Sequence, residues 1–255
     1  MEKWFQDLWA GIAVWAQDFS DEFYLNFIKG DRWTWLLDGL KNTLIITFFA
    51  LLLGIVLGVI VAVVRSTYDK NKVSLKRKGG VGYVLLAVAN FICNIYLTVI
   101  RGTPIVVQLM IMYFVVFTST NDGVMVAIVA FGINSGAYVA EIFRGGIMAI
   151  DNGQFEAGRS LGLNYIQTMW YIVIPQMFKV VLPTLCNEFI VLIKETSVAG
   201  YVGIMDLTKA GELITGRTFS YFMPLIAVAL IYLVMVIILT RLVGILERGL
   251  RKSER

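Results

Sequence analysis

The chain has 255 residues, of which 58% are hydrophobic and only 16% are charged, and its mean hydropathy is +0.76. A soluble domain is typically about half apolar and about a quarter charged, so this composition indicates a polytopic membrane protein. The formal net charge is +4, and the absence of His removes the commonest metal ligand and the commonest general base near neutral pH.

The sequence also lacks the motifs that are typical of metal sites and nucleotide sites. The two cysteines, Cys93 and Cys186, lie far apart in apolar surroundings, and the chain has neither a CxxC motif nor another metal-ligand spacing. We therefore expect buried structural thiols and no metal site. No GxxxxGK[ST] motif is present, so no phosphate-cradling loop is predicted in this chain.

The N-terminal 37 residues are rich in aromatic and acidic side chains. They lack the basic region followed by an apolar region that marks a cleavable signal peptide. Residues 1–38 carry seven acids and three bases, which suits the outer side of a membrane. We expect residues 1–37 to form an amphipathic segment at the outer membrane surface, ahead of a transmembrane domain at residues 38–255.

Uncharged runs and loop charges together predict five membrane spans. A spanning helix needs ~20 mostly apolar residues, and residues 42–64 form the first such run. Segment 65–80, predicted as a loop, carries six bases and one acid, and the tail from Arg241 carries five bases and two acids. The positive-inside rule places both segments in the cytosol, so an even number of spans separates them.

That parity requires segment 79–121 to cross the membrane once. We expect one long element that is broken near Arg101–Pro104, with its first part along the cytosolic interface or running obliquely. The other spans are predicted near residues 123–143, 179–199 and 222–246. The predicted fold is all-α, with the N-terminus outside, the C-terminus in the cytosol and a cytosolic loop at residues 144–178.

The cytosolic loop shows the signals of two short helices. Glu156, Ala157 and Gly158 belong to the first helix, which Gly162 is expected to stop. Asn164 is a predicted N-cap for a second helix over 165–174, ended by Pro175. The small residues at positions 157, 158 and 162 would let another surface approach the backbone, although an ordinary connecting loop remains the simpler alternative.

The loop resembles the cytosolic coupling loop of permease subunits in bacterial ABC importers. The resemblance runs through Gly153, Glu156, Ala157, Gly158, Gly162, Ile172 and Pro175. Gly158 stands where the family pattern has Ala, and Ile174 stands where it has Leu. Arg101–Pro104 with Gln108, and segments 137–146 and 194–197, resemble the polar amino acid branch of the family, so the similarity covers about residues 38–250.

This resemblance implies a machine of several subunits in the bacterial plasma membrane. It implies two permease subunits, identical or related, two cytosolic ATPase subunits that bind ATP and Mg, and an extracytoplasmic solute-binding protein. The chain would then be a multi-pass permease and no enzyme. It would hold no cofactor, bind no nucleic acid and import a polar amino acid, of the glutamine, histidine, arginine or cystine type, by alternating access. The alternative is a stand-alone secondary carrier or channel, although such proteins often show an internal repeat and none is visible here.

Polar residues within the spans are the candidates for the substrate path, because ionisable groups at membrane depth are expensive. In the third span, Asn134, Tyr138 and Glu141 fall on one helical face and Ser135 borders it. Glu141 would pair with a substrate ammonium, or alternatively with Arg144 or another group near the membrane surface. Further candidates, each with a structural alternative, are Arg101 and Gln108 beside the predicted break, and Lys194 in the fourth span.

Overall fold

The computed structural model describes the backbone of residues 2–78 and 80–252, and the side chains of residue 4, residues 9–70, residue 72 and residues 80–250. The described backbone consists of helices and contains no strand. Five helical stretches in it are long and apolar enough to cross a membrane, as predicted. They are Trp33–Lys70, Val81–Gly102, Gly123–Met148, Tyr165–Val202 and Phe222–Leu250.

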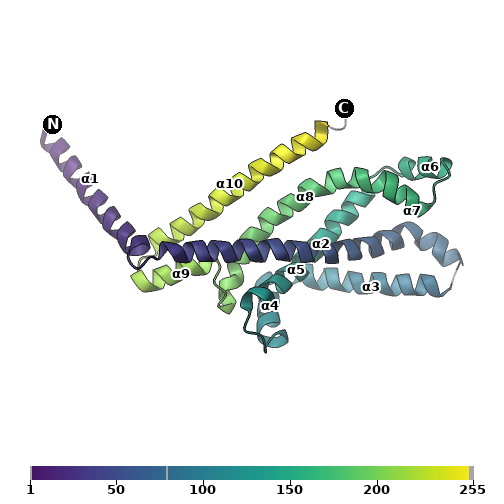
Figure 1. The fold of residues 1–255 in the computed structure, drawn as a ribbon, viewed down its shortest axis with the longest axis horizontal. Helices are drawn as coiled ribbons and strands as arrows, with labels where there is room; N and C mark the ends of the chain where they lie inside the picture. The colour runs from purple at the N-terminus through teal and green to yellow at the C-terminus, as the bar shows by residue number, and fades with distance from the viewer. Residues whose placement is uncertain (1, 79, 253–255) are drawn as a thin grey trace.

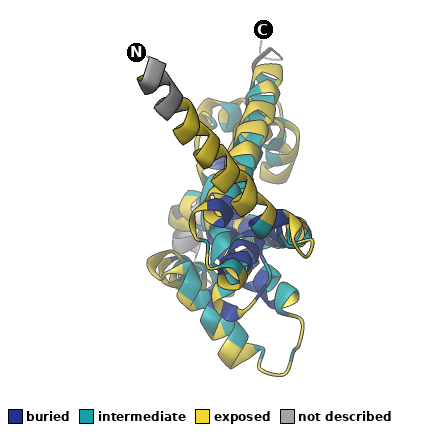
Figure 2. Ribbon diagram, turned by 90° about the vertical axis from the view of Figure 1, so that its left-hand side faces the viewer, coloured by how far each residue is buried: buried dark blue, intermediate teal, exposed yellow. Residues whose placement is uncertain are grey.

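The N-terminal segment forms a helix that projects from the rest of the molecule (Figure 1). Helix α1 (Glu2–Phe23) continues into a π-helical turn, η1 (Tyr24–Ile28), and the chain turns before α2 (Trp33–Lys78). Figure 2 shows α1 exposed along its described length. Its exposed aromatic residues include Trp9, Trp15 and Phe19. The turn falls a few residues before position 38, where we expected the transmembrane domain to begin.

Helix α2 is much longer than the predicted first span. It has 46 residues and continues through the basic segment that we predicted to be a loop, so that prediction is wrong for residues 65–78. These residues include neither Gly nor Pro, and nothing in them interrupts helical hydrogen bonding until Gly79 and Gly80. The side chains of residues 73–79, including three of the predicted loop bases, lie outside the described residues.

The predicted break near Arg101–Pro104 is confirmed, but it divides segment 79–121 differently from our expectation. Helix α3 (Val81–Gly102) ends at the break, and α4 (Ile105–Ile111) continues after it into a π-helical turn, η2 (Met112–Val116). With 22 residues, α3 is about 33 Å long and can cross a membrane alone. By length and composition α3 is therefore the candidate span of this segment, whereas we had expected its first part to lie along the cytosolic interface or to run obliquely.

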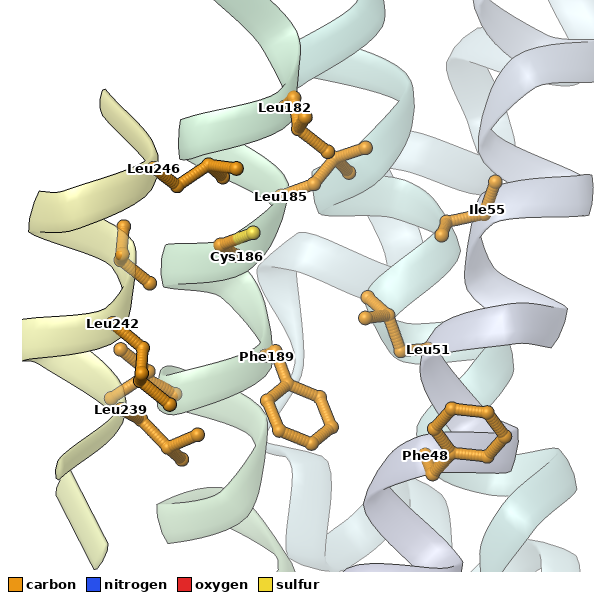
Figure 3. A pocket seen from close by; sticks show the side chains of 12 residues that line it. Phe48, Leu51, Ile55, Leu182, Leu185, Cys186, Phe189, Leu239, Leu242 and Leu246 are labelled. Carbon is orange, nitrogen blue, oxygen red and sulfur yellow. The ribbon is translucent and has the colours of Figure 1, made fainter. Parts of the chain in front are cut away.

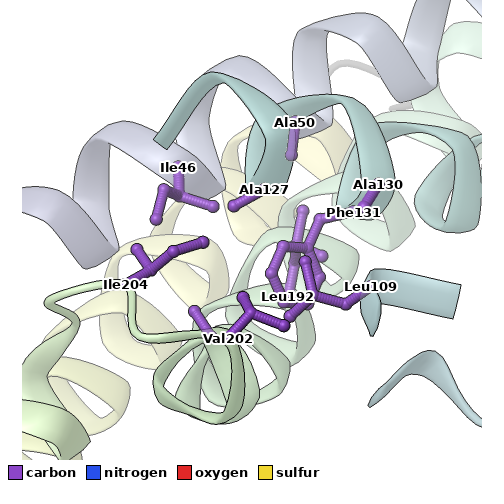
Figure 4. Close-up of a cluster of buried hydrophobic side chains, with 10 residues drawn as sticks. Ile46, Ala50, Leu109, Ala127, Ala130, Phe131, Leu192, Val202 and Ile204 are labelled. Carbon is purple, nitrogen blue, oxygen red and sulfur yellow. The ribbon is translucent and has the colours of Figure 1, made fainter. Parts of the chain in front are cut away.

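Helix α5 (Gly123–Met148) is the central helix of the bundle and packs closely against α2. A Cβ atom built at Gly58 of α2 would lie 2.8 Å from the backbone nitrogen of Ala140, and one at Gly54 would lie 3.1 Å from that of Gly136. The two helices therefore meet backbone to backbone through small residues, as in GxxxG packing. Figure 4 shows a cluster of buried hydrophobic side chains beside this contact. Ile46, Ala127 and Phe131 belong to that cluster.

The second half of the loop and the fourth span form one continuous helical stretch. After α6 (Asn152–Ser160), α7 (Tyr165–Thr168) leads through a π-helical turn, η3 (Met169–Val173), into α8 (Ile174–Glu195) and a final 3-10 turn, η4 (Thr196–Val202). The prediction that Pro175 ends the second loop helix is wrong. The hydrogen-bond register changes at η3, and Pro175 sits at the first positions of α8, where its missing N–H is tolerated.

A short helix that the sequence analysis missed precedes the last span. Helix α9 (Leu207–Thr218) begins at Asp206, whose side chain accepts hydrogen bonds from the backbone nitrogens of Thr208 and Lys209. Burial raises the pKa of this carboxyl group, and those N–H donors partly offset the effect. Helix α10 (Phe222–Lys252) starts at the predicted residue, with Pro224 in its first turn, and extends beyond the predicted end near residue 246.

Candidate functional site

The loop between α5 and α8 is held by the caps that its sequence predicts. Gly162 has a φ of +79°, and its N–H donates to Arg159 O at 2.9 Å, so the predicted glycine stop of α6 is confirmed. Asn164 and Gln167 form a reciprocal capping box at the start of α7, which confirms Asn164 as the N-cap. These caps fix where α6 ends and α7 begins.

The small residues of α6 do not all face outward. Gly158 is buried, and a Cβ atom there would lie 2.7 Å from the Thr168 side chain of α7. Its small size therefore serves packing inside the loop, whereas Glu156 and Ala157 are exposed. Of the other predicted coupling residues, Gly153 donates its N–H to Asp151 Oδ1 at the start of α6, Ile172 is partly buried in η3, and Pro175 is exposed.

A charged cluster joins α2, α3 and α5. Glu141 of α5 pairs with Arg65 of α2 through Oε1 at 2.8 Å and with Arg144 through Oε2 at 2.9 Å. Arg101, at the end of α3, lies 3.8 Å from Glu141 Oε1, and Arg144 lies 3.8 Å from Asp69 Oδ2. The alternative that Glu141 pairs with Arg144 is therefore the arrangement present here, together with Arg65, which the sequence analysis counted only as a loop base.

Arg101 has the most exposed side chain of the three arginines in this cluster. Its side chain is 46% exposed, compared with 19% for Arg65 and 31% for Arg144. Its guanidinium carbon lies 5.8 Å from the centre of the Tyr138 ring, which brings two of the predicted substrate-path residues together. Because Glu141 is already paired with two other arginines, Arg101 is available to meet an additional anion.

Gln108 and Asn134 meet at the break between α3 and α4. Gln108 Nε2 donates to Ile100 O at 2.7 Å and to Thr103 Oγ1 at 2.8 Å, and Gln108 Oε1 accepts from Asn134 Nδ2 at 3.0 Å. These bonds satisfy a backbone carbonyl near the break, as a polar group at an interrupted helix should. Asn134 is buried, and its Oδ1 atom has no hydrogen-bond partner among the described residues.

Ser135 and Lys194 belong neither to the charged cluster around Glu141 nor to the pair of Gln108 and Asn134. Ser135 is fully buried and donates to Glu188 Oε1 of α8 at 3.1 Å, so it joins α5 to α8. Lys194 is exposed near the end of α8 and is not part of the charged cluster. The sequence analysis did not single out Glu188, although its carboxylate interrupts an otherwise apolar stretch and was a usable signal.

An apolar groove opens between α2, α8 and α10 (Figure 3). Its volume is about 480 Å³. Its lining is formed by Phe48, Leu51, Ile55, Leu182, Leu185, Cys186, Phe189, Ile190, Leu239, Leu242, Val243 and Leu246. This groove offers no partner for an ammonium or a carboxylate, so its chemistry does not suit a polar solute.

The family model described as "Binding-protein-dependent transport system inner membrane component" matches residues 82–252. The chain belongs to this permease family. It is therefore a multi-pass membrane protein of the ABC importer class.

Individual relatives are similar in sequence to this permease over most of its length. The glutamine transport system permease protein GlnP of Escherichia coli strain K12 is 36% identical over 220 residues, which are 85% of this chain and 93% of GlnP. The arginine transport system permease protein ArtQ of Bacillus subtilis is 36% identical over 222 residues, which are 86% of this chain and 94% of ArtQ.

Solved structures match the fold of the permease as well. A crystal structure of an amino acid ABC transporter with histidines has a TM-score of 0.74 and 36% identity, and the match covers 88% of this chain and 98% of that one. The MetNI methionine ABC transporter in an inward-facing conformation has a TM-score of 0.69 at 20% identity, over 84% of this chain and 95% of that one, and supports the fold alone.

Proposed function

We propose that this chain is the membrane-spanning permease subunit of an ATP-driven importer in a bacterial plasma membrane, and that its cargo is a polar amino acid. The observation that carries the proposal is the match, over more than nine tenths of their length, to permeases named for glutamine and arginine. A second copy or a related permease completes the pathway, a solute-binding protein delivers the cargo, and two ATPase subunits bind ATP and Mg.

The loop between α5 and α8 supports the assignment of an ATPase-docking surface. Three large apolar side chains of this loop, Leu161, Ile166 and Trp170, are at least 66% exposed. Exposed apolar side chains gathered at one end of a molecule are typical of a surface that meets a protein partner. In this proposal the loop lies in the cytosol, the N-terminus and α1 lie on the outer side, and ATP hydrolysis takes place in the partner.

Reconstitution tests the proposed function directly. We expect the chain, co-expressed with the ATPase and solute-binding protein of its importer, to co-purify with the ATPase. Proteoliposomes should then take up a radiolabelled polar amino acid only when ATP, Mg and the binding protein are supplied. A panel of glutamine, arginine, histidine and cystine identifies the cargo. Uptake by the chain without any ATPase would contradict the proposal and favour a secondary carrier.

Arg101 is our proposed contact for the substrate carboxylate. It is half exposed, it stands beside the Tyr138 ring, and its single described ion pair is a long one. Hydrogen bonds to charged groups contribute about 1.5–3 kcal/mol, so we expect Arg101→Gln to raise the KM for uptake by about tenfold or more. ATPase binding should be unchanged.

A matched control is Arg217→Gln, which removes an exposed arginine from α9. Its uptake kinetics should equal those of the wild type. If Arg101→Gln keeps the wild-type KM, then Arg101 has only a structural role at the end of α3.

A further inference from the structure

The last turns of α2 contact the loop that follows α5. Helix α2 has 46 residues and is about 69 Å long, whereas a membrane crossing needs about 20 residues. We use the name α2 extension for its residues Arg65–Lys78, which lie beyond the predicted span at 42–64. Within this extension, Lys70 places its Nζ atom 3.5 Å from the centre of the Phe155 ring of α6.

Phe155 connects the Lys70 cation to helix α7. Its ring stacks on Tyr165 of α7, with a centroid separation of 6.4 Å and an angle of 17° between the ring planes. Lys70 therefore caps an aromatic pair that joins α6 and α7. An ammonium over an aromatic face is attracted by the negative charge density of the ring, and the attraction is directional.

A cavity separates α6 from α2 beside the Lys70 contact. The cavity has a volume of about 590 Å³, and its lining includes Lys70, Phe155, Glu156 and Tyr165. Among the residues whose side chains the structure describes, Lys70 is the one from α2 in that lining. The described contact between α2 and α6 across the cavity is that of the Lys70 cation with the Phe155 ring.

The same turns of α2 also hold α5. Asp69, next to Lys70, lies 3.8 Å from Arg144, and Arg65, just over one turn earlier, pairs with Glu141 at 2.8 Å. One short stretch of α2 therefore contacts the end of α5 through ion pairs and α6 through Lys70. The close approach of Gly158 to Thr168 also holds α6 against α7.

We infer that Lys70 is a positioning residue for α6, which sets the orientation in which the loop meets the ATPase. The inference rests on the proposed function for the identity of the partner. Without the Lys70 cation, α6 keeps its contacts to α7 but loses this contact with α2. Force applied to α6 by the ATPase then reaches the membrane helices less completely.

The test compares Lys70→Gln with Lys70→Arg in the reconstituted complex. We expect Lys70→Gln to raise the ATP consumed per amino acid imported by about two- to fivefold, the factor that corresponds to an exposed cation–π contact. Lys70→Arg keeps a cation over the ring and should restore the wild-type ratio. Phe155→Leu should match Lys70→Gln, and the double variant should be no worse than either single variant.

Lys72→Gln is the matched control, because Lys72 is an exposed lysine on the same helix two residues away. The ATP consumed per amino acid imported should be the same in Lys72→Gln as in the wild type. A wild-type ratio in Lys70→Gln, or an equal defect in Lys72→Gln, would overturn the inference.

A second measurement needs no partner and separates this inference from the proposed function. In the isolated chain, hydrogen exchange of the α6 amides should be faster in Lys70→Gln than in the wild type, and unchanged in Lys72→Gln. If the wild-type chain fails to bind an ATPase, the proposed function fails, while faster exchange would still support the contact. Unchanged exchange in Lys70→Gln would reject it whatever the partner does.

Discussion

Gly58→Leu is expected to prevent the helical bundle from folding. A Cβ atom at this position would lie 2.6 Å from Val139 Cγ1 and 2.8 Å from the backbone nitrogen of Ala140. Overpacking typically costs about 1–3 kcal/mol, and the cost is expected to exceed that range here because a backbone atom cannot rotate away. We expect almost no monodisperse protein after detergent extraction, measured by fluorescence-detected size-exclusion chromatography.

Gly244→Leu is the matched control for this substitution. Gly244 lies in the spanning helix α10, and a Cβ atom there would meet no atom within 4 Å. The control makes the same change in apolar volume and should leave the yield and the midpoint of thermal unfolding close to wild type. Equal behaviour of the two variants would show that α2 and α5 are not in backbone contact at Gly58.

Glu156→Lys is expected to abolish uptake by the reconstituted importer. Glu156 is exposed on α6, on the loop that we propose as the ATPase-docking surface. Reversing a charge at a protein interface can cost several kcal/mol when like charges are brought together, so transport should fall by at least about a hundredfold. Membrane insertion and yield should remain normal, because the side chain does not support the packing of α6.

Glu212→Lys is its control, since Glu212 is an exposed acid on α9, at the opposite end of the molecule from α6 (Figure 1). Uptake and ATP hydrolysis are measured in parallel for both variants. Wild-type uptake in Glu156→Lys, or in its combination with Gly162→Asp, would remove α6 from the coupling surface.

Features that depend on local sequence were the most predictable part of the fold. The number of spans followed from uncharged runs taken together with loop charges. The break followed from Gly102 and Pro104, two positions apart, and the loop caps followed from Gly162 and Asn164. Each of these signals acts on the backbone within a few residues. The end of α2 was misplaced because charge was taken as evidence for a loop, although lysine and arginine are good helix formers.

Contacts between distant residues could not be predicted in the same way. Arg65 and Glu141 are 76 positions apart, and no local pattern pairs them. The inward orientation of Gly158 depends on Thr168 in the next helix, so its small size was assigned to an external partner. Helix α9 was missed because its anchors are on α2, where Thr43 Oγ1 accepts the Leu207 N–H and Asn42 donates to Met205 O.

The backbone contact between α2 and α5 limits how the molecule can change shape. Gly54 and Gly58 are about one helical turn apart, and both bring the backbone of α2 against that of α5. We therefore expect α2 and α5 to move together as one rigid body. Rotations of that body require joints elsewhere, and the interruptions at Thr103–Pro104 and at Gly203, which has a φ of +78°, are suitably placed for them.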